Sequence, residues 1–139
     1  MTYDISWLID DEVIYVHYHG HTSTEELIQS FVETYDLVES SPRALVHSIV
    51  DLSGLSESLK PFDTIKAVRA AKSHERVGWN LAIMPTKSMP IELAIKMTSS
   101  IIKSRNRVFS TVDEARTFLQ EMDPTVHWEN MNYDVLAGK

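Results

Sequence analysis

The chain has 139 residues, of which 43% are hydrophobic and 24% charged, with a formal net charge of −7. This length suits one domain that buries its own core, and the acidic balance argues against general nucleic-acid binding. The sequence contains no cysteine, which excludes disulfides and thiolate chemistry. No apolar run approaches the roughly 20 residues that cross a bilayer, and the start lacks a signal-peptide pattern. We therefore expect a cytoplasmic protein without a membrane span.

The charges are distributed unevenly along the chain. Residues 1–59 carry 11 acidic residues and one basic residue, and residues 60–107 carry three acidic and ten basic residues. Residues 108–139 return to six acidic and two basic residues. Two interpretations of the basic middle stay open, namely a solvated helix surface and a face for an anionic ligand or an acidic partner.

The first half of the chain predicts a β-hairpin, a helix and a buried strand. Tyr3–Ile9 and residues 13–19 are rich in β-branched and aromatic residues, and an acidic turn separates them. Ser23 and Glu26 have capping-box spacing at the start of an amphipathic helix. The mostly apolar residues 44–52 suit a strand that is covered on both faces.

The second half predicts alternating helices and strands. Apolar residues recur every three positions over residues 59–71 and predict a second helix. Residues 77–84 predict a strand, residues 90–103 a third helix, and residues 108–110 a short last strand. Thr111 caps a fourth helix, which has acidic residues in its first turn.

The order β-β-α-β-α-β-α-β-α predicts an α/β fold. Alternation after the hairpin predicts parallel strands with right-handed crossovers, and the first strand is antiparallel to its hairpin partner. We expect residues 1–124 to form a single mixed sheet of about five strands with four helices. The tail, residues 125–139, is rich in apolar residues such as Trp128 and Met131, and we expect it to dock on the domain or on a neighbouring subunit.

Three short segments carry a resemblance to a known family. They are Gly20 before Thr22-Ser23-Thr24-Glu25-Glu26-Leu27, then Ile49-Val50-Asp51-Leu52-Ser53-Gly54-Leu55, and finally Val112-Asp113-Glu114-Ala115. Together with the element order they resemble STAS-like domains, the group of small bacterial anti-sigma-factor antagonists and CRAL-TRIO-like proteins. The resemblance covers roughly residues 3–122 and implies a STAS-like fold with a regulatory role.

The resemblance also implies where a phosphoserine switch would lie, near the start of the second helix. An ungapped count from Asp51 places Lys60 at the acceptor position, and Ser56 and Ser58 align only with a gap. We therefore expect the switch to be absent, although phosphorylation of Ser56 or Ser58 stays open. The residues that we expect to bind a partner or ligand are Asp51, Ser53, Ser56, Ser58, Lys60, Lys66 and Arg69.

Asp51 is the best single candidate for a site, because ligands of open α/β sheets gather at the carboxyl ends of strands. The alternative is that its carboxylate accepts backbone N–H groups in a turn with Ser53 and Gly54. The chain has neither a glycine-rich phosphate loop nor a Gly-x-Ser-x-Gly motif. We therefore expect no catalytic residue and no cofactor.

His17, His19 and His21 alternate along the second predicted strand. Residues i and i+2 of a strand share a face, and two imidazoles at this spacing can share a zinc ion with a carboxylate as third ligand. The alternative is a strand face that binds no metal. A metal site at His17 and His19 is therefore the weaker of the two interpretations.

The third predicted helix, residues 90–103, has an apolar arc wider than one sheet contact needs. Deep burial, a homodimer interface and an apolar ligand pocket stay open as explanations. The interface or pocket residues are Trp79, Met84, Met89, Leu93, Met97 and Ile101. Our leading hypothesis is a non-enzymatic regulatory or interaction module for a protein partner, and the alternative is a carrier or sensor of a lipid or other apolar small molecule.

Overall fold

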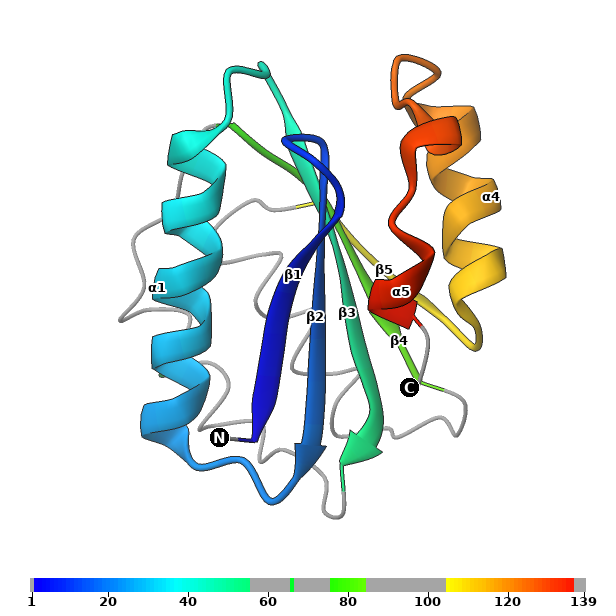
Figure 1. The fold of residues 1–139 in the computed structure, drawn as a ribbon. Coiled ribbons are helices and arrows are strands. Elements are labelled where there is room, and N and C mark those ends of the chain that lie inside the picture. Colours follow the sequence, from blue (N-terminus) through cyan, green and yellow to red (C-terminus); the bar gives the residue numbers. More distant parts are fainter. Residues whose placement is uncertain (1, 56–65, 67–75, 85–104, 137–139) are drawn as a thin grey trace.

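The computed structural model describes residues 2–55, 66, 76–84 and 105–136, and it contains one mixed sheet of five strands (Figure 1). The strands are β1 (Tyr3–Ile9), β2 (Val13–Gly20), β3 (Val46–Leu55), β4 (Val77–Ile83) and β5 (Arg105–Phe109). They lie side by side in chain order, with β1 antiparallel to β2 and the other neighbours parallel. The predicted α/β class and the five-stranded mixed sheet are therefore confirmed.

The helices of the described residues cover both faces of this sheet. They are α1 (Thr24–Ser40), α4 (Val112–Met122) and the short α5 (Tyr133–Leu136), with a 3-10 helix η1 at Trp128–Asn130. The predicted second and third helices lie, apart from Lys66, outside the described residues, so the count of four helices stays a prediction. None of the described helices is long and apolar enough to cross a membrane.

Helix α1 covers the first face, and its start is fixed by the predicted capping box. The Ser23 hydroxyl accepts the backbone N–H of Glu26 at 3.2 Å, and the Glu26 carboxylate accepts the backbone N–H of Ser23 at 3.4 Å. One side of the helix is apolar and packs on the strands. The buried residues of this cluster are Tyr3, Ile14, Val16, Tyr18, Leu27, Val38 and Val46.

The second face is covered by α4 and by the C-terminal segment beside it (Figure 1). The backbone N–H of Asn132 donates to the carbonyl oxygen of Leu8 at 2.7 Å, which joins this segment to β1. The buried residues of this cluster are Leu8, Ile9, Val13, Tyr15, Ile49, Leu81, Ile83, Ala115, Leu119, Val126, Trp128 and Met131. The tail therefore packs on its own domain.

Two strand boundaries differ from the sequence prediction. We expected the strand to end at residue 52, but β3 continues to Leu55, and an extra residue forms a β-bulge where Asp51 pairs with His17 and Gly54 with His19. The last strand, predicted over residues 108–110, begins at Arg105. It starts with three consecutive polar residues, Arg105, Asn106 and Arg107, at the edge of the sheet, so its sequence lacks the apolar pattern of a buried strand.

Candidate functional site

Six polar side chains meet at the end of the sheet where β3 begins. They come from four parts of the chain, which are the β1–β2 turn, the segment before β3, β3 itself and the segment that follows α4. We call this group the Arg43 network, and its members are Glu12, Arg43, His47, Asp123, Thr125 and His127.

His47 is the buried centre of the network, with a side chain that is 1% exposed. Its Nδ1 accepts the backbone N–H of Trp79 at 2.9 Å, and its Nε2 lies 2.8 Å from Asp123 Oδ2. The ring is therefore the tautomer that donates from Nε2 to Asp123. A Cβ atom on Gly78 would lie 2.7 Å from His47 Cε1, so this position of β4 needs glycine.

The protonation of this pair follows from its surroundings. Burial lowers the pKa of His47, and although Asp123 opposes this effect, Arg43 and Arg105 reinforce it. For Asp123, burial raises the pKa, but hydrogen bonds from His47 and Thr125 outweigh burial and bring the pKa to about 2. At neutral pH the pair is a neutral imidazole and a carboxylate. Both ring nitrogens are in use, so His47 has none left to accept a proton from a substrate.

Arg43 links the two ends of the network. Its Nη1 lies 3.3 Å from Glu12 Oε1, and its Nη2 donates to Thr125 Oγ1 at 2.7 Å. Glu12 is buried, accepts the backbone N–H of His127 at 2.7 Å and lies 2.8 Å from His127 Nδ1. These contacts attach the C-terminal segment to the hairpin turn and to the start of β3.

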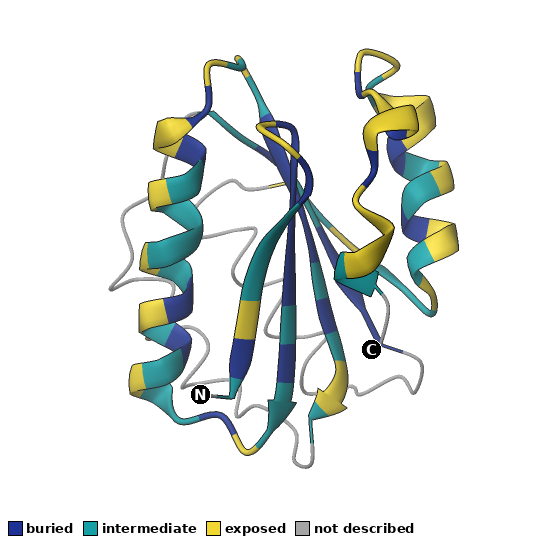
Figure 2. Cartoon of the chain, viewed as in Figure 1, coloured by how far each residue is buried: buried dark blue, intermediate teal, exposed yellow. Residues whose placement is uncertain are grey.

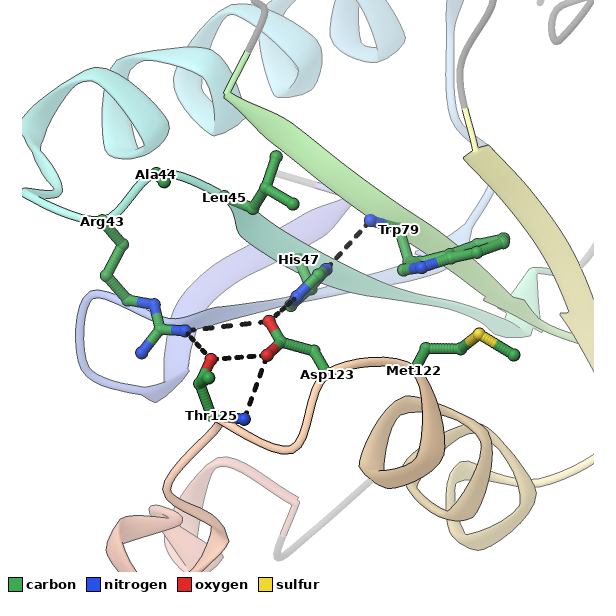
Figure 3. A pocket seen from close by; sticks show the side chains of 8 residues that line it. All are labelled: Arg43, Ala44, Leu45, His47, Trp79, Met122, Asp123 and Thr125. Atoms are coloured by element: carbon green, nitrogen blue, oxygen red, sulfur yellow. Dashed lines mark hydrogen bonds and ion pairs between the residues drawn. The ribbon is translucent and has the colours of Figure 1, made fainter.

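An open depression of about 390 Å³ lies beside the network, and we call it the Trp79 depression (Figure 3). Its lining residues are Arg43, Ala44, Leu45, His47, Trp79, Met122, Asp123 and Thr125. Figure 3 shows Arg43 and Thr125 at one end and Trp79 and Met122 at the other. Phe118 contacts the Trp79 ring edge-on at 4.9 Å between centroids and holds the indole in place.

A second depression, of about 480 Å³, lies along α4, and we call it the α4 depression. The aromatic rings of Phe109 and Phe118, 5.3 Å apart between centroids, form its apolar part. The other lining residues, all exposed, are Asp113, Glu114, Thr117 and Glu121. None of these six lining residues is basic, so the depression combines an apolar floor with a negatively charged rim.

Asp51, the best single candidate from the sequence, is buried and fully engaged in hydrogen bonds. The Tyr15 hydroxyl donates to its Oδ2 at 2.5 Å, and the backbone N–H and hydroxyl of Ser53 donate to its Oδ1 at 2.9 and 2.5 Å. Burial, together with Asp51, raises the pKa of Tyr15, which keeps the phenol a donor. Asp51 and Ser53 are thus hydrogen-bonded to each other within β3, with Asp51 buried and Ser53 exposed.

Three other predicted site residues, Trp79, Met84 and Lys66, have different surroundings in the structure. Trp79 lines the depression named after it, Met84 is buried after β4, and Lys66 is exposed. The remaining predicted residues lie outside the described part of the chain: Ser56, Ser58, Lys60, Arg69, Met89, Leu93, Met97 and Ile101. His17 and His19 lie on one face of β2, with Asp4 of β1 beside them.

Sequence reasoning missed the Arg43 network. The sequence does contain one hint, because His47 interrupts an apolar segment and a histidine on a buried strand needs partners.

No protein-family model matches the chain, and no curated protein matches it either. The function must therefore be argued from the contacts of the chain itself.

Proposed function

We propose that this chain is a non-enzymatic protein-interaction module of STAS-like architecture, and that the α4 depression docks a basic segment of a partner protein. The observation that carries the proposal is the apolar floor of Phe109 and Phe118 inside a rim of three exposed carboxylates. An aromatic floor accepts an apolar side chain of the partner, and the rim attracts lysine or arginine residues beside it.

The charge of α4 supports a basic rather than an acidic partner. The only basic residue of the helix is Arg116, and its guanidinium carbon lies 5.2 Å from the centroid of the Trp128 ring, within cation–π distance. The carboxylates of Asp113, Glu114 and Glu121 therefore dominate the exposed side of α4. Charges at the rim of an interface mainly raise the association rate and select partners.

The chemistry of the buried titratable groups supports a role in binding rather than catalysis. His47 uses both ring nitrogens, and Asp51 accepts three hydrogen bonds from Tyr15 and Ser53. A general acid or base must reach a substrate proton with a free atom. These two groups instead fix the strands under α4, which gives the docking surface a rigid base.

A peptide-binding experiment tests the proposal. The probe is a fluorescein-labelled peptide with one leucine flanked by lysines and arginines, followed by fluorescence anisotropy. We expect saturable binding that weakens as salt is raised, because the rim charges are exposed. Thr117→Arg places a cation in the depression and should raise Kd at least about tenfold, whereas Gln120→Arg, on the exposed side of α4 outside the depression, should change Kd much less.

Two outcomes contradict this proposal. One is equal binding of a peptide in which glutamates replace the basic residues. The other is equal loss of affinity in Thr117→Arg and Gln120→Arg, because such a result would trace binding to the overall charge of the protein rather than to the depression.

A second candidate function is the binding of a small amphipathic molecule in the Trp79 depression. Its volume of about 390 Å³ falls in the range of roughly 300–1,000 Å³ that is usual for ligand pockets. The apolar end at Trp79 and Met122 and the polar end at Arg43 and Thr125 suit a ligand with an apolar body and a polar head. Native mass spectrometry of gently purified protein should then show a bound mass that Met122→Arg removes, and an empty wild-type protein contradicts this candidate.

A further inference from the structure

Three residues with metal-binding side chains lie together at the far end of the β1–β2 hairpin from its turn. Asp4 of β1 is the direct cross-strand partner of His17 of β2, and His19 follows two residues later. Side chains two apart in a strand point to the same face, and antiparallel cross-strand partners are close neighbours. The pairing of β1 with β2 therefore places all three side chains on one face.

The backbone around this group is held between β1 and β3, with the β-bulge of β3 beside it. The backbone N–H of His19 donates to the carbonyl oxygen of Thr2 at 2.8 Å. On the other side, β3 presents Gly54, and a Cβ atom there would lie 3.1 Å from His17 Nε2. Glycine at this position leaves room for the imidazole. The three side chains are thus carried by strands rather than by a loop, which favours a defined geometry.

The distances within the group suit a metal ion. One ligand atom from each of the three residues lies within 4.8 Å of the other two, and His19 Nε2 is 3.4 Å from Asp4 Oδ2. Two donors that each lie about 2.0–2.2 Å from a tetrahedral zinc ion are separated by roughly 3.3–3.5 Å. The His19–Asp4 pair already has this separation. The ring centroids of His17 and His19 lie 5.6 Å apart, with an angle of 28° between the ring planes.

We propose that Asp4, His17 and His19 form a binding site for a divalent transition-metal ion, with zinc as the best fit. Two imidazoles and one carboxylate are a ligand set for zinc and related first-row metals, whereas magnesium and calcium require more oxygen ligands. Three protein ligands leave one tetrahedral position for water or for a group from another molecule. The partly exposed side chains of Asp4 and His19, at 58% and 43%, leave the site open to solvent.

This site is independent of the proposed docking surface on α4. Its ligands come from β1 and β2, and none of them lines the α4 depression. Loss of the metal ligands should therefore leave peptide binding unchanged, and loss of peptide binding should leave the metal site intact. The two proposals can fail separately.

The test is a metal titration of untagged protein after treatment with a chelator. We expect zinc chloride to give a calorimetric isotherm with one ion per chain, and cobalt chloride to give visible absorption bands typical of tetrahedral coordination. Asp4→Asn, His17→Ala and His19→Ala should each weaken zinc binding at least about tenfold. Substitution of residues that only hydrogen-bond to metal ligands already lowers metal affinity by about this factor. His21→Ala is the matched control, because His21 lies outside the group, and it should retain the wild-type affinity.

The outcomes separate cleanly. No binding by wild-type protein at zinc concentrations that load ordinary histidine sites overturns the proposal. So does zinc binding that Asp4→Asn and His19→Ala leave unchanged, since both side chains are exposed enough for the variants to fold. Loss of binding in these two variants but not in His21→Ala supports the site even if His17→Ala fails to fold.

Discussion

Among the described residues, the 17-residue helix α1 covers one face of the sheet, whereas α4, η1 and α5 share the other face (Figure 2). On the α1 face a fully buried polar contact, between Tyr18 and Ser30, is neutral. On the α4 face the buried polar groups include Glu12, His47 and Asp51. The packing of α1 is mainly apolar, with charged contacts at its two ends, from Thr2 to the Glu26 carboxylate and from Arg76 to the Glu39 carbonyl oxygen. The short segments of the other face are joined by buried charged groups. Both depressions lie on the charged face, which is where we place the function.

The largest loss of stability is expected when Gly78, which lies against the His47 ring, is replaced by alanine. Gly78→Ala would force His47 away from both Asp123 and the Trp79 N–H, because the new Cβ would collide with the imidazole ring. Leaving buried polar groups without their partners should lower the free energy of unfolding by about 3 kcal/mol or more. Urea denaturation measures this loss.

Gly20→Ala is the control for this substitution. Gly20 has φ +67° and open space around it, so alanine there adds only backbone strain of about 1 kcal/mol. Equal losses in the two variants contradict the view that the His47 contact, rather than glycine flexibility, holds the α4 face together.

Acidification should weaken the α4 face before the α1 face. Burial lowers the pKa of His47 below its ordinary value of about 6.5. The unfolded chain therefore takes up the proton first, and stability is lost as the pH falls below about 6.5. Replacing His47 by glutamine should flatten the dependence of the free energy of unfolding on pH just below about 6.5, which urea titrations at several pH values measure.

A second acid step should involve both faces. The pKa of Asp123 is lowered to about 2, so its contribution, at most about 2 kcal/mol, is lost as the pH falls from about 3.8 toward 2. On the α1 side, hydrogen bonds from Thr2 bring the pKa of Glu26 to about 2. The stability that Glu26 contributes is therefore also lost as the pH falls toward 2. Glu26→Gln should reduce this step only, and an effect of Glu26→Gln near pH 6 contradicts the assignment to His47. Asp123→Asn should reduce this step and also enlarge the His47 step, because the Asp123 carboxylate raises the pKa of His47.

The sequence predicted the α1 face better than the α4 face. Capping at Ser23 and Glu26 and the apolar side of α1 are local patterns, and the structure confirms both. The Arg43 network joins residues as far apart as Glu12 and His127. No periodic pattern encodes such a contact, because it depends on where the C-terminal segment docks. For the same reason Asp51 could be placed at a strand, while its bond to Tyr15 could not be foreseen.

A smaller effect is expected from the neutral polar contact of the α1 face. The Ser30 hydroxyl donates to the Leu27 carbonyl oxygen at 2.7 Å, and it accepts a hydrogen bond from the Tyr18 hydroxyl. Ser30→Ala leaves the buried Tyr18 hydroxyl without this acceptor and should cost about 1–2 kcal/mol. Because no charge is involved, the loss should be the same at low and high salt. Tyr18→Phe combined with Ser30→Ala should recover part of it in a double-mutant cycle, and full additivity contradicts the coupling.

The smallest expected losses of stability come from the N-cap residues of α1 and α4. Because the two caps make the same kind of hydrogen bond, removing each one compares the two faces of the sheet. Ser23 and Thr111 each accept a backbone N–H at 3.2 Å, from Glu26 and Glu114. Ser23→Ala and Thr111→Ala should each lower the free energy of unfolding by about 1 kcal/mol. Ser23→Ala should have the larger effect, because it also removes the hydrogen bond from the Ser23 hydroxyl to the Glu26 carboxylate.

The same two variants should differ in binding, although their stabilities are similar. Thr111→Ala loosens the first turn of α4, which carries the rim residues Asp113 and Glu114, so it should weaken binding of the basic peptide a few-fold. Ser23→Ala acts on α1, away from that rim, and should leave the peptide Kd unchanged. Equal effects of both caps on Kd would mean that binding follows global stability, whereas an effect confined to Thr111→Ala ties recognition to the order of one helical turn on the charged face.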